Sequence, residues 1–115
     1  MASSSRGGDA STLAVSDKVQ TAKLALEEAK KKNAVLKDIR GNTLGGRLEK
    51  LLESLPALQT WRNEASSAAD QAYYDLQISI TNDLIAYREG RKPEPDYVRD
   101  AERDLQDAEK AVLKA

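Results

Sequence analysis

The stretch that decides the fold reads LEKLLESLPALQTWRNEASSAADQAYYDL at residues 48–76. Its apolar residues recur in alternating steps of three and four, interrupted only by the polar Arg62, at Leu48, Leu51, Leu55, Leu58, Ala65, Ala69, Ala72 and Leu76. This spacing places them on one face of a helix, and a repeat of about 3.5 residues is typical of helices that wind around each other. Because so narrow a stripe cannot be covered by its own helix, the sequence predicts packing of helix on helix.

Two further stripes with the same spacing flank the first. They lie at Val15, Val19, Ala22, Leu26, Ala29, Asn33 and Leu36, and at Val98, Ala101, Leu105, Ala108, Val112 and Ala115. Glycines and prolines separate the three stripes, and Gly90 is placed to end the middle helix. We therefore expect an all-α chain with a flexible tail over residues 1–12 and a single helical domain over 13–115, with helices over 13–40, 44–89 and 95–115.

The middle helix is expected to organise the fold. Pro56 is its one internal breaker, so the helix either kinks at this residue or begins anew there. Short connections on both sides predict an antiparallel helical hairpin or a three-helix strip, and dimerisation would close its open side into a helical bundle. The residues expected in such an oligomer interface are Val19, Leu26, Asn33, Leu36, Leu48, Leu55, Trp61, Ala69, Leu76 and Leu105.

The composition argues against catalysis. The chain has no Cys and no His, which removes thiolate nucleophiles, disulfides, zinc–thiolate sites and the commonest general base. No glycine-rich phosphate loop follows a predicted strand. We expect no enzyme, no catalytic residue, no cofactor, no metal and no small-molecule substrate. Without a signal-like apolar core or a run of about 20 apolar residues, we expect a soluble cytoplasmic protein with no membrane partner.

One line of lysines is a candidate for phosphate contacts. Lys23, Lys30 and Lys37 recur every seven residues and so lie on one side of the first helix. In the alternative interpretation these lysines pair with acidic residues such as Glu102 and Glu109 across a helix interface, which would set partner choice and orientation. The formal net charge of −1 favours the second interpretation.

Asn33 and the aromatic residues each have two interpretations. Asn33 occupies a core position of its stripe, where a buried amide can set register and oligomeric state, but it also lies near the end of the first helix. Trp61 and Tyr73 are either anchors for a partner or fillers between alanine-rich surfaces. Tyr74 points away from the stripe and is expected to be the most exposed aromatic side chain.

Two short stretches, DKVQTA at residues 17–22 and LIAYREG at residues 84–90, resemble the small helical RNA-silencing suppressors of nodaviruses, as does the order of elements. This resemblance implies an antiparallel four-helix dimer that lies along double-stranded RNA, with phosphates contacted by Arg47, Lys50 and Arg62. The chain departs from that pattern because the middle helix beyond Arg62 is acidic, with Glu64, Asp70, Asp75 and Asp83. Carboxylates on this face would repel a phosphate backbone.

These features favour function through surfaces. We expect a non-catalytic module for protein–protein interaction and self-assembly, of the class that includes viral and phage assembly factors or inhibitors. One alternative is a dimeric suppressor that binds double-stranded RNA, and another is the coiled receptor-binding segment of a bacterial toxin. The expected partners are a second copy in a homodimer, another protein, or double-stranded RNA.

Overall fold

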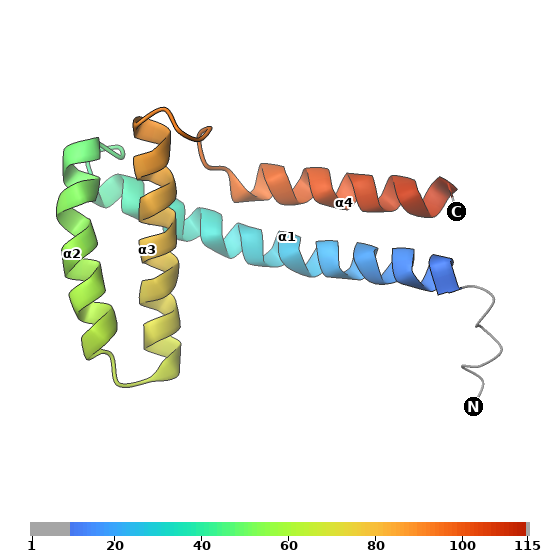
Figure 1. Ribbon diagram of the computed structural model, residues 1–115, viewed down its shortest axis with the longest axis horizontal. Coiled ribbons are helices and arrows are strands. Elements are labelled where there is room, and N and C mark those ends of the chain that lie inside the picture. The colour runs from blue at the N-terminus through green and yellow to red at the C-terminus, as the bar shows by residue number, and fades with distance from the viewer. Residues whose placement is uncertain (1–9, 115) are drawn as a thin grey trace. The chain divides into compact units, whose positions relative to one another are not determined.

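The computed structural model describes the backbone of residues 10–114 and the side chains of residues 17–114. The described residues form helices and no strands, which confirms the all-α class (Figure 1). The helices are α1 (Ala10–Asn42), α2 (Leu48–Glu64), α3 (Ala68–Arg88) and α4 (Tyr97–Lys114). Most of the expected tail lies outside the described residues, but residues 10–12 already belong to α1.

The chain divides into two compact units. The first, called here the two-helix unit, contains the part of α1 up to Lys30 together with α4. The second, the hairpin unit, comprises residues 31–96 and therefore contains the end of α1, both central helices and the linker that follows them.

The middle of the chain forms two helices where the stripe predicts one. Helix α2 continues through Pro56, and the chain turns at residues 65–67. The side chain of Ser67 accepts a hydrogen bond from the backbone N–H of Asp70 at 3.1 Å, which caps the start of α3. The side-chain amide of Gln71 donates to the carbonyl of Ala65 at 3.0 Å and supports the same turn. A serine followed three residues later by an acidic residue is a local signal for a new helix.

This turn makes α2 and α3 an antiparallel pair that lie side by side (Figure 1). The core between them consists of large aliphatic side chains, joined by two from the end of α1. The buried residues are Leu36, Ile39, Leu51, Leu58, Ile80, Leu84 and Ile85. Because the turn resets the register, Ala69 and Ala72 of the predicted stripe are exposed, and the buried face of α3 lies further along the helix.

The connection between α1 and α2 is a tight turn that contains one strained residue. Helix α1 runs past Gly41 to Asn42, and Leu44 adopts a left-handed conformation with φ of 55°. The backbone N–H of Gly45 donates to the carbonyl of Arg40 at 2.8 Å, which closes the helix end in a Schellman-like arrangement. Leucine thus occupies a position that glycine normally takes.

Helix α3 ends at Arg88, with Glu89 as its C-cap, and Gly90 follows. Gly90 has a φ of 76°, its N–H donates to the carbonyl of Tyr87, and the N–H of Arg91 donates to that of Ala86. Three polar contacts hold the linker that follows within the hairpin unit. Lys92 pairs with Asp83 at 3.3 Å, and Glu94 pairs with Arg40 at 3.5 Å. The side-chain amide of Asn33 donates to Asp96 at 3.1 Å.

Arg88 joins the two ends of the hairpin unit. Its Nε donates to the carbonyl of Gly46 at 2.7 Å and its Nη2 donates to that of Gly45 at 2.9 Å. One guanidinium at the end of α3 therefore satisfies two carbonyls of the α1–α2 turn.

The two-helix unit has a thinner core. In Figure 1, α4 runs antiparallel to the first part of α1. The fully buried apolar side chains among its described residues are Ala22, Ala29 and Ala101, whereas Leu26 and Leu105 are only half-buried. The first and third stripes thus face each other through small side chains.

We predict that Leu44→Gly raises the free energy of unfolding by about 0.5–1 kcal/mol. A non-glycine residue in the left-handed region costs about 1–2 kcal/mol, which glycine avoids. Glycine loses more backbone entropy on folding, and this loss offsets part of the gain. Leu52→Gly is the matched control, since Leu52 is also an exposed leucine but lies inside α2. That change should lower stability by about 1 kcal/mol in urea melts. Equal losses in both variants would contradict the left-handed assignment.

We also predict that Leu84→Ala lowers the free energy of unfolding by about 2–5 kcal/mol, because its side chain is 1 % exposed and its removal leaves a cavity. Leu52→Ala removes the same atoms from a side chain that is 49 % exposed and should cost less than about 1 kcal/mol. Thermal or urea unfolding measures both, and similar losses would show that the core of the hairpin unit is misassigned.

Candidate binding surfaces

The first candidate surface is a groove of about 570 Å³ between α1 and α4 in the two-helix unit. Alanine and threonine side chains form its floor, and charged side chains form its rims. The lining residues are Asp17, Lys18, Thr21, Ala22, Ala25, Asp104, Asp107, Ala108 and Ala111. A floor of such small side chains allows another helix to approach closely.

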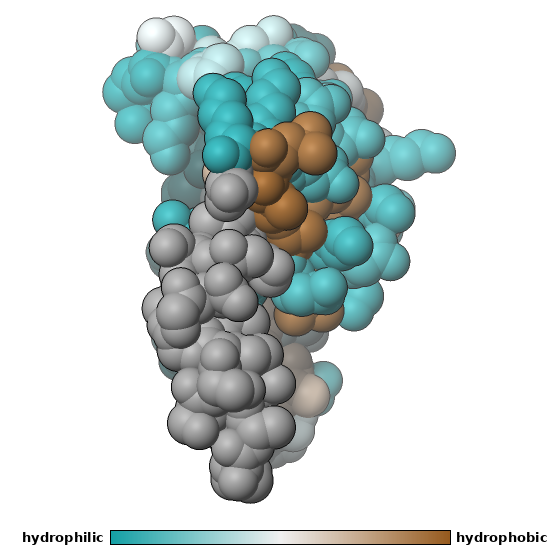
Figure 2. Space-filling model, turned by 90° about the vertical axis from the view of Figure 1, so that its right-hand side faces the viewer, coloured by the Kyte–Doolittle hydropathy of each residue, from teal (hydrophilic) through white to brown (hydrophobic). Residues whose placement is uncertain are grey.

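Large apolar side chains of the same unit are exposed to solvent. Leu24 of α1 is 68 % exposed, and Val112 and Leu113 near the end of α4 are 37 % and 87 % exposed. Figure 2 views the molecule from the side on which the free ends of α1 and α4 lie, and it shows hydrophobic side chains gathered in a patch among hydrophilic ones. This unit therefore presents apolar area that its own two helices leave uncovered.

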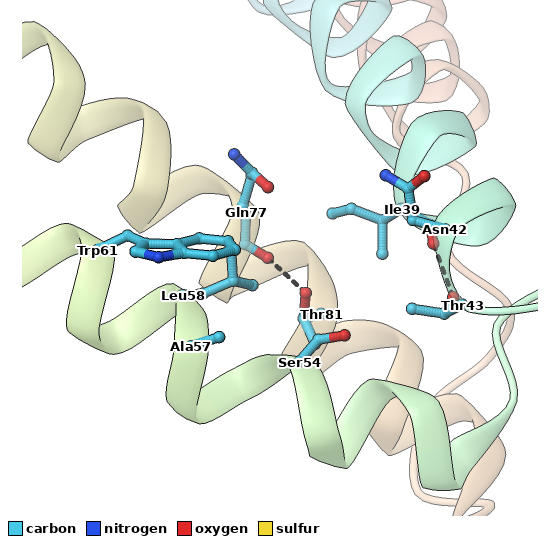
Figure 3. Close-up of a pocket in the computed structure, with 9 residues that line it drawn as sticks. All are labelled: Ile39, Asn42, Thr43, Ser54, Ala57, Leu58, Trp61, Gln77 and Thr81. Carbon is cyan, nitrogen blue, oxygen red and sulfur yellow. Dashed lines mark hydrogen bonds between the residues drawn. The ribbon is translucent and has the colours of Figure 1, made fainter.

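The second candidate surface is a cavity of about 210 Å³ in the hairpin unit (Figure 3). It lies where the end of α1 meets α2 and α3, and its lining combines apolar and uncharged polar side chains. These are Ile39, Asn42, Thr43, Ser54, Ala57, Leu58, Trp61, Gln77 and Thr81. Sequence reasoning missed this site, because only the folded hairpin unit brings the three helices together.

An aromatic cluster borders this cavity. The ring centroids of Trp61 and Tyr74 are 6.2 Å apart, and those of Tyr73 and Tyr74 are 6.0 Å apart. Trp61 and Tyr73 are about half exposed, whereas Tyr74 lies between them and is more buried. The expectation that Tyr74 is the most exposed aromatic is wrong, because the turn at residues 65–67 changes which face of α3 meets α2.

The residues expected in an oligomer interface lie in different environments. Val19, Leu26, Leu48, Leu55, Leu76 and Leu105 are half-buried, Leu36 is buried, and Trp61 and Ala69 are exposed. Asn33 is engaged within the chain, because its Nδ2 donates to Asp96 Oδ1 at 3.1 Å. The amide thus holds the linker to α1.

The basic residues matched to phosphate contacts by the resemblance are ion-paired. The N–O distances are 3.0 Å for Arg47–Glu49, 3.5 Å for Lys50–Glu53 and 3.0 Å for Arg62–Asp75. The last pair also links α2 to α3. A phosphate would have to compete with a carboxylate at each of these positions.

Fewer of the lysines Lys23, Lys30 and Lys37 of α1 are ion-paired than of the basic residues just described. Lys30 pairs with Glu27 at 2.9 Å, whereas Lys23 and Lys37 are exposed and form no ion pair among the described residues. The predicted acidic partners Glu102 and Glu109 are likewise exposed and unpaired within the described part of one chain. Pairing of these lysines with α4 therefore remains a prediction about a second chain.

Two further features concern metals and membranes. The side chains that the structure describes contain no cluster of three or more metal-ligating residues. None of the helices, as far as they are described, is long and apolar enough to cross a membrane.

No protein-family model, no curated protein and no solved structure matches this chain.

We expect the unmodified chain to bind a short RNA duplex more weakly than about 1 µM at physiological salt, which is the non-specific range. The carboxylates beside Arg47, Lys50 and Arg62 are the physical reason. Gel shifts at two salt concentrations measure this affinity. Salt-sensitive binding below about 1 µM that disappears in the Lys23→Gln, Lys30→Gln, Lys37→Gln triple variant would contradict it and identify the lysine line as the contact.

Proposed function

We propose that this chain is a non-catalytic helical interaction module that associates with a second copy through the groove face of α1 and α4. The observation that carries the proposal is the open, alanine-floored groove in a unit whose described residues form two helices. Its alanine side chains Ala25, Ala108 and Ala111 are exposed or half-buried in the single chain, and a second copy would cover them.

The energetics of the two-helix unit support association. Burial of an alanine methyl contributes about 0.8 kcal/mol, whereas burial of a leucine side chain contributes about 1.5–3 kcal/mol. Ala22, Ala29 and Ala101 are the apolar side chains fully buried among the described residues of this unit, so its own core is weak. Covering Ala25, Ala108 and Ala111 of the groove, which are exposed or half-buried, would add apolar burial to this unit.

The charges on the rims also support a two-fold arrangement. Asp17 and Lys18 lie on the α1 rim, and Asp104 and Asp107 lie on the α4 rim. None of these four side chains forms an ion pair among the described residues. In an isologous dimer the same face meets itself, so the α1 rim of one copy can approach the α4 rim of the other and pair Lys18 with an aspartate.

The biological class of such a module follows only by analogy. Small helical proteins without catalytic groups include viral and phage assembly factors and inhibitors, and the half-exposed Trp61 and Tyr73 offer contact area for another protein. The ion pairs at Arg47, Lys50 and Arg62 weigh against a function on duplex RNA.

A substitution that places a charged side chain in the groove tests whether two copies associate there. Ala25 lines the groove and is exposed in the single chain, so Ala25→Glu leaves its fold intact but buries a carboxylate in the proposed dimer. We expect light scattering at micromolar concentration to give twice the monomer mass for the unmodified chain and the monomer mass for Ala25→Glu.

Gln20→Glu is the matched control, because it adds the same charge to an exposed position of α1 that does not line the groove. This variant should stay dimeric. A monomeric unmodified chain, or equal loss of the dimer in both variants, would refute association through the groove.

A further inference from the structure

We propose that the cavity of the hairpin unit binds an uncharged nitrogen heterocycle of nucleobase size. This inference is independent of self-association, because every lining residue belongs to residues 31–96 of one chain. It assigns a ligand class to a site that combines a neutral lining, the Ser54 hydroxyl as an acceptor, two unpaired amides and an indole.

The charge and the volume of the cavity limit which ligands can bind. None of the nine lining residues is charged, so the cavity offers no compensation for burying a phosphate or a carboxylate. Its volume of about 210 Å³ is smaller than the roughly 300–1,000 Å³ of sites that enclose drug-sized molecules. A single ring system is therefore the appropriate occupant.

The hydroxyl groups of the cavity present acceptors. Each one already donates its proton to the backbone carbonyl four residues earlier: Thr43 to Ile39 at 2.6 Å, Ser54 to Lys50 at 2.8 Å, and Thr81 to Gln77 at 2.7 Å. A hydroxyl has only one proton, so the remaining lone pairs can only accept a hydrogen bond. Thr43 and Thr81 are 2 % and 0 % exposed, so the half-buried Ser54 is the hydroxyl that a ligand can reach. Its lone pairs favour a ring that brings its own N–H donor.

Two side-chain amides complete the polar lining. Those of Asn42 and Gln77 make no hydrogen bond among the described residues, and Figure 3 shows them on opposite sides of the cavity. Each amide offers both donors and an acceptor. A purely apolar partner side chain would cover these groups without replacing their hydrogen bonds to water, which is unfavourable.

The indole of Trp61 supplies the aromatic wall. It is 52 % exposed, and Figure 3 shows it across the cavity from Ile39 and Asn42. Stacking on an aromatic side chain is tolerant of base identity, whereas the amides can read a ring edge that carries both donors and acceptors. Nucleobases combine a planar face with such an edge.

An adjoining hollow leaves room for a substituent on the ring. It has a volume of about 490 Å³, shares Ile39, Asn42 and Gln77 with the cavity, and is also lined by Lys37 and Tyr73. A ribose could therefore leave the cavity on this side. The same base chemistry could come from a free nucleoside or from an unpaired base of a single strand.

The experiment uses Trp61 as a reporter, because it is the only tryptophan of the chain. Adenosine is titrated into the full chain while tryptophan fluorescence is recorded. We expect a saturable change with a dissociation constant on the order of 1 mM or tighter, the affinity that typical ligand efficiency gives to a base-sized ring. Purine riboside lacks the exocyclic amine and should bind at least about 10-fold more weakly, because cavity acceptors then lose their donor.

Three variants test the assigned residues. Gln77→Met keeps the side-chain length but removes the amide, and Asn42→Leu does so at an exposed helix end where folding is little affected. Both should weaken adenosine binding at least about 10-fold. Gln59→Met is the matched control, because Gln59 is exposed and does not line the cavity, and it should bind like the unmodified chain.

A short single-stranded oligoadenylate distinguishes the two sources. If the base belongs to a strand, the oligonucleotide binds more tightly than adenosine and its affinity falls with salt. If the ligand is a nucleoside, adenosine binds at least as tightly and salt has no effect. Either result supports the assigned chemistry.

The proposal is overturned if neither probe changes the fluorescence, if purine riboside binds as well as adenosine, or if both amide variants bind normally. It is also overturned if the Trp61 emission shifts to shorter wavelength as the protein concentration rises and does not change when adenosine is added. A second copy of the chain would then fill the cavity. The Ala25→Glu variant should bind adenosine unchanged, which separates this outcome from a failure of groove-mediated association.

Discussion

The guanidinium of Arg88 is the contact on which the hairpin unit depends. It satisfies the carbonyls of both Gly45 and Gly46 and so ties the end of α3 to the turn between α1 and α2. The left-handed residues of that turn leave carbonyls that lie outside any helix, and a planar group with several donors is suited to them. Through this clamp the end of α1 is held near α2 and α3, and side chains of all three helices line the cavity.

The shortage of large apolar side chains explains why the two units differ. The chain has no Phe, and its leucines and isoleucines are concentrated where α2 and α3 face each other. The two-helix unit relies on alanines, which allow close approach of helices but contribute little burial each. A weak core with an open groove is the physical basis for proposing association there, whereas the hairpin unit buries leucine and isoleucine within one chain.

The candidate surfaces could be predicted from the sequence to different extents. The stripes of α1 and α4 predicted apolar faces, and the groove lies beside Ala22 and Ala108, which belong to those stripes. The charged residues were visible as candidates, but their pairing was not, because Arg62 meets Asp75 only after the chain turns back at residues 65–67. The cavity had no signal in the sequence, since its polar residues are scattered along the chain and none is unusual by itself.

The sequence by itself determined the helical class and the glycine that follows the end of α3, because periodicity and end signals act over a few neighbouring residues. The break between α2 and α3 was also encoded locally, in Ser67 and Asp70, although the continuous stripe concealed it. Only the tertiary structure decided which apolar residues are buried in α3 and which polar groups meet at the cavity. These depend on the register of helices packed across a turn, and a shift of one residue turns a helix by about 100° and changes the buried face.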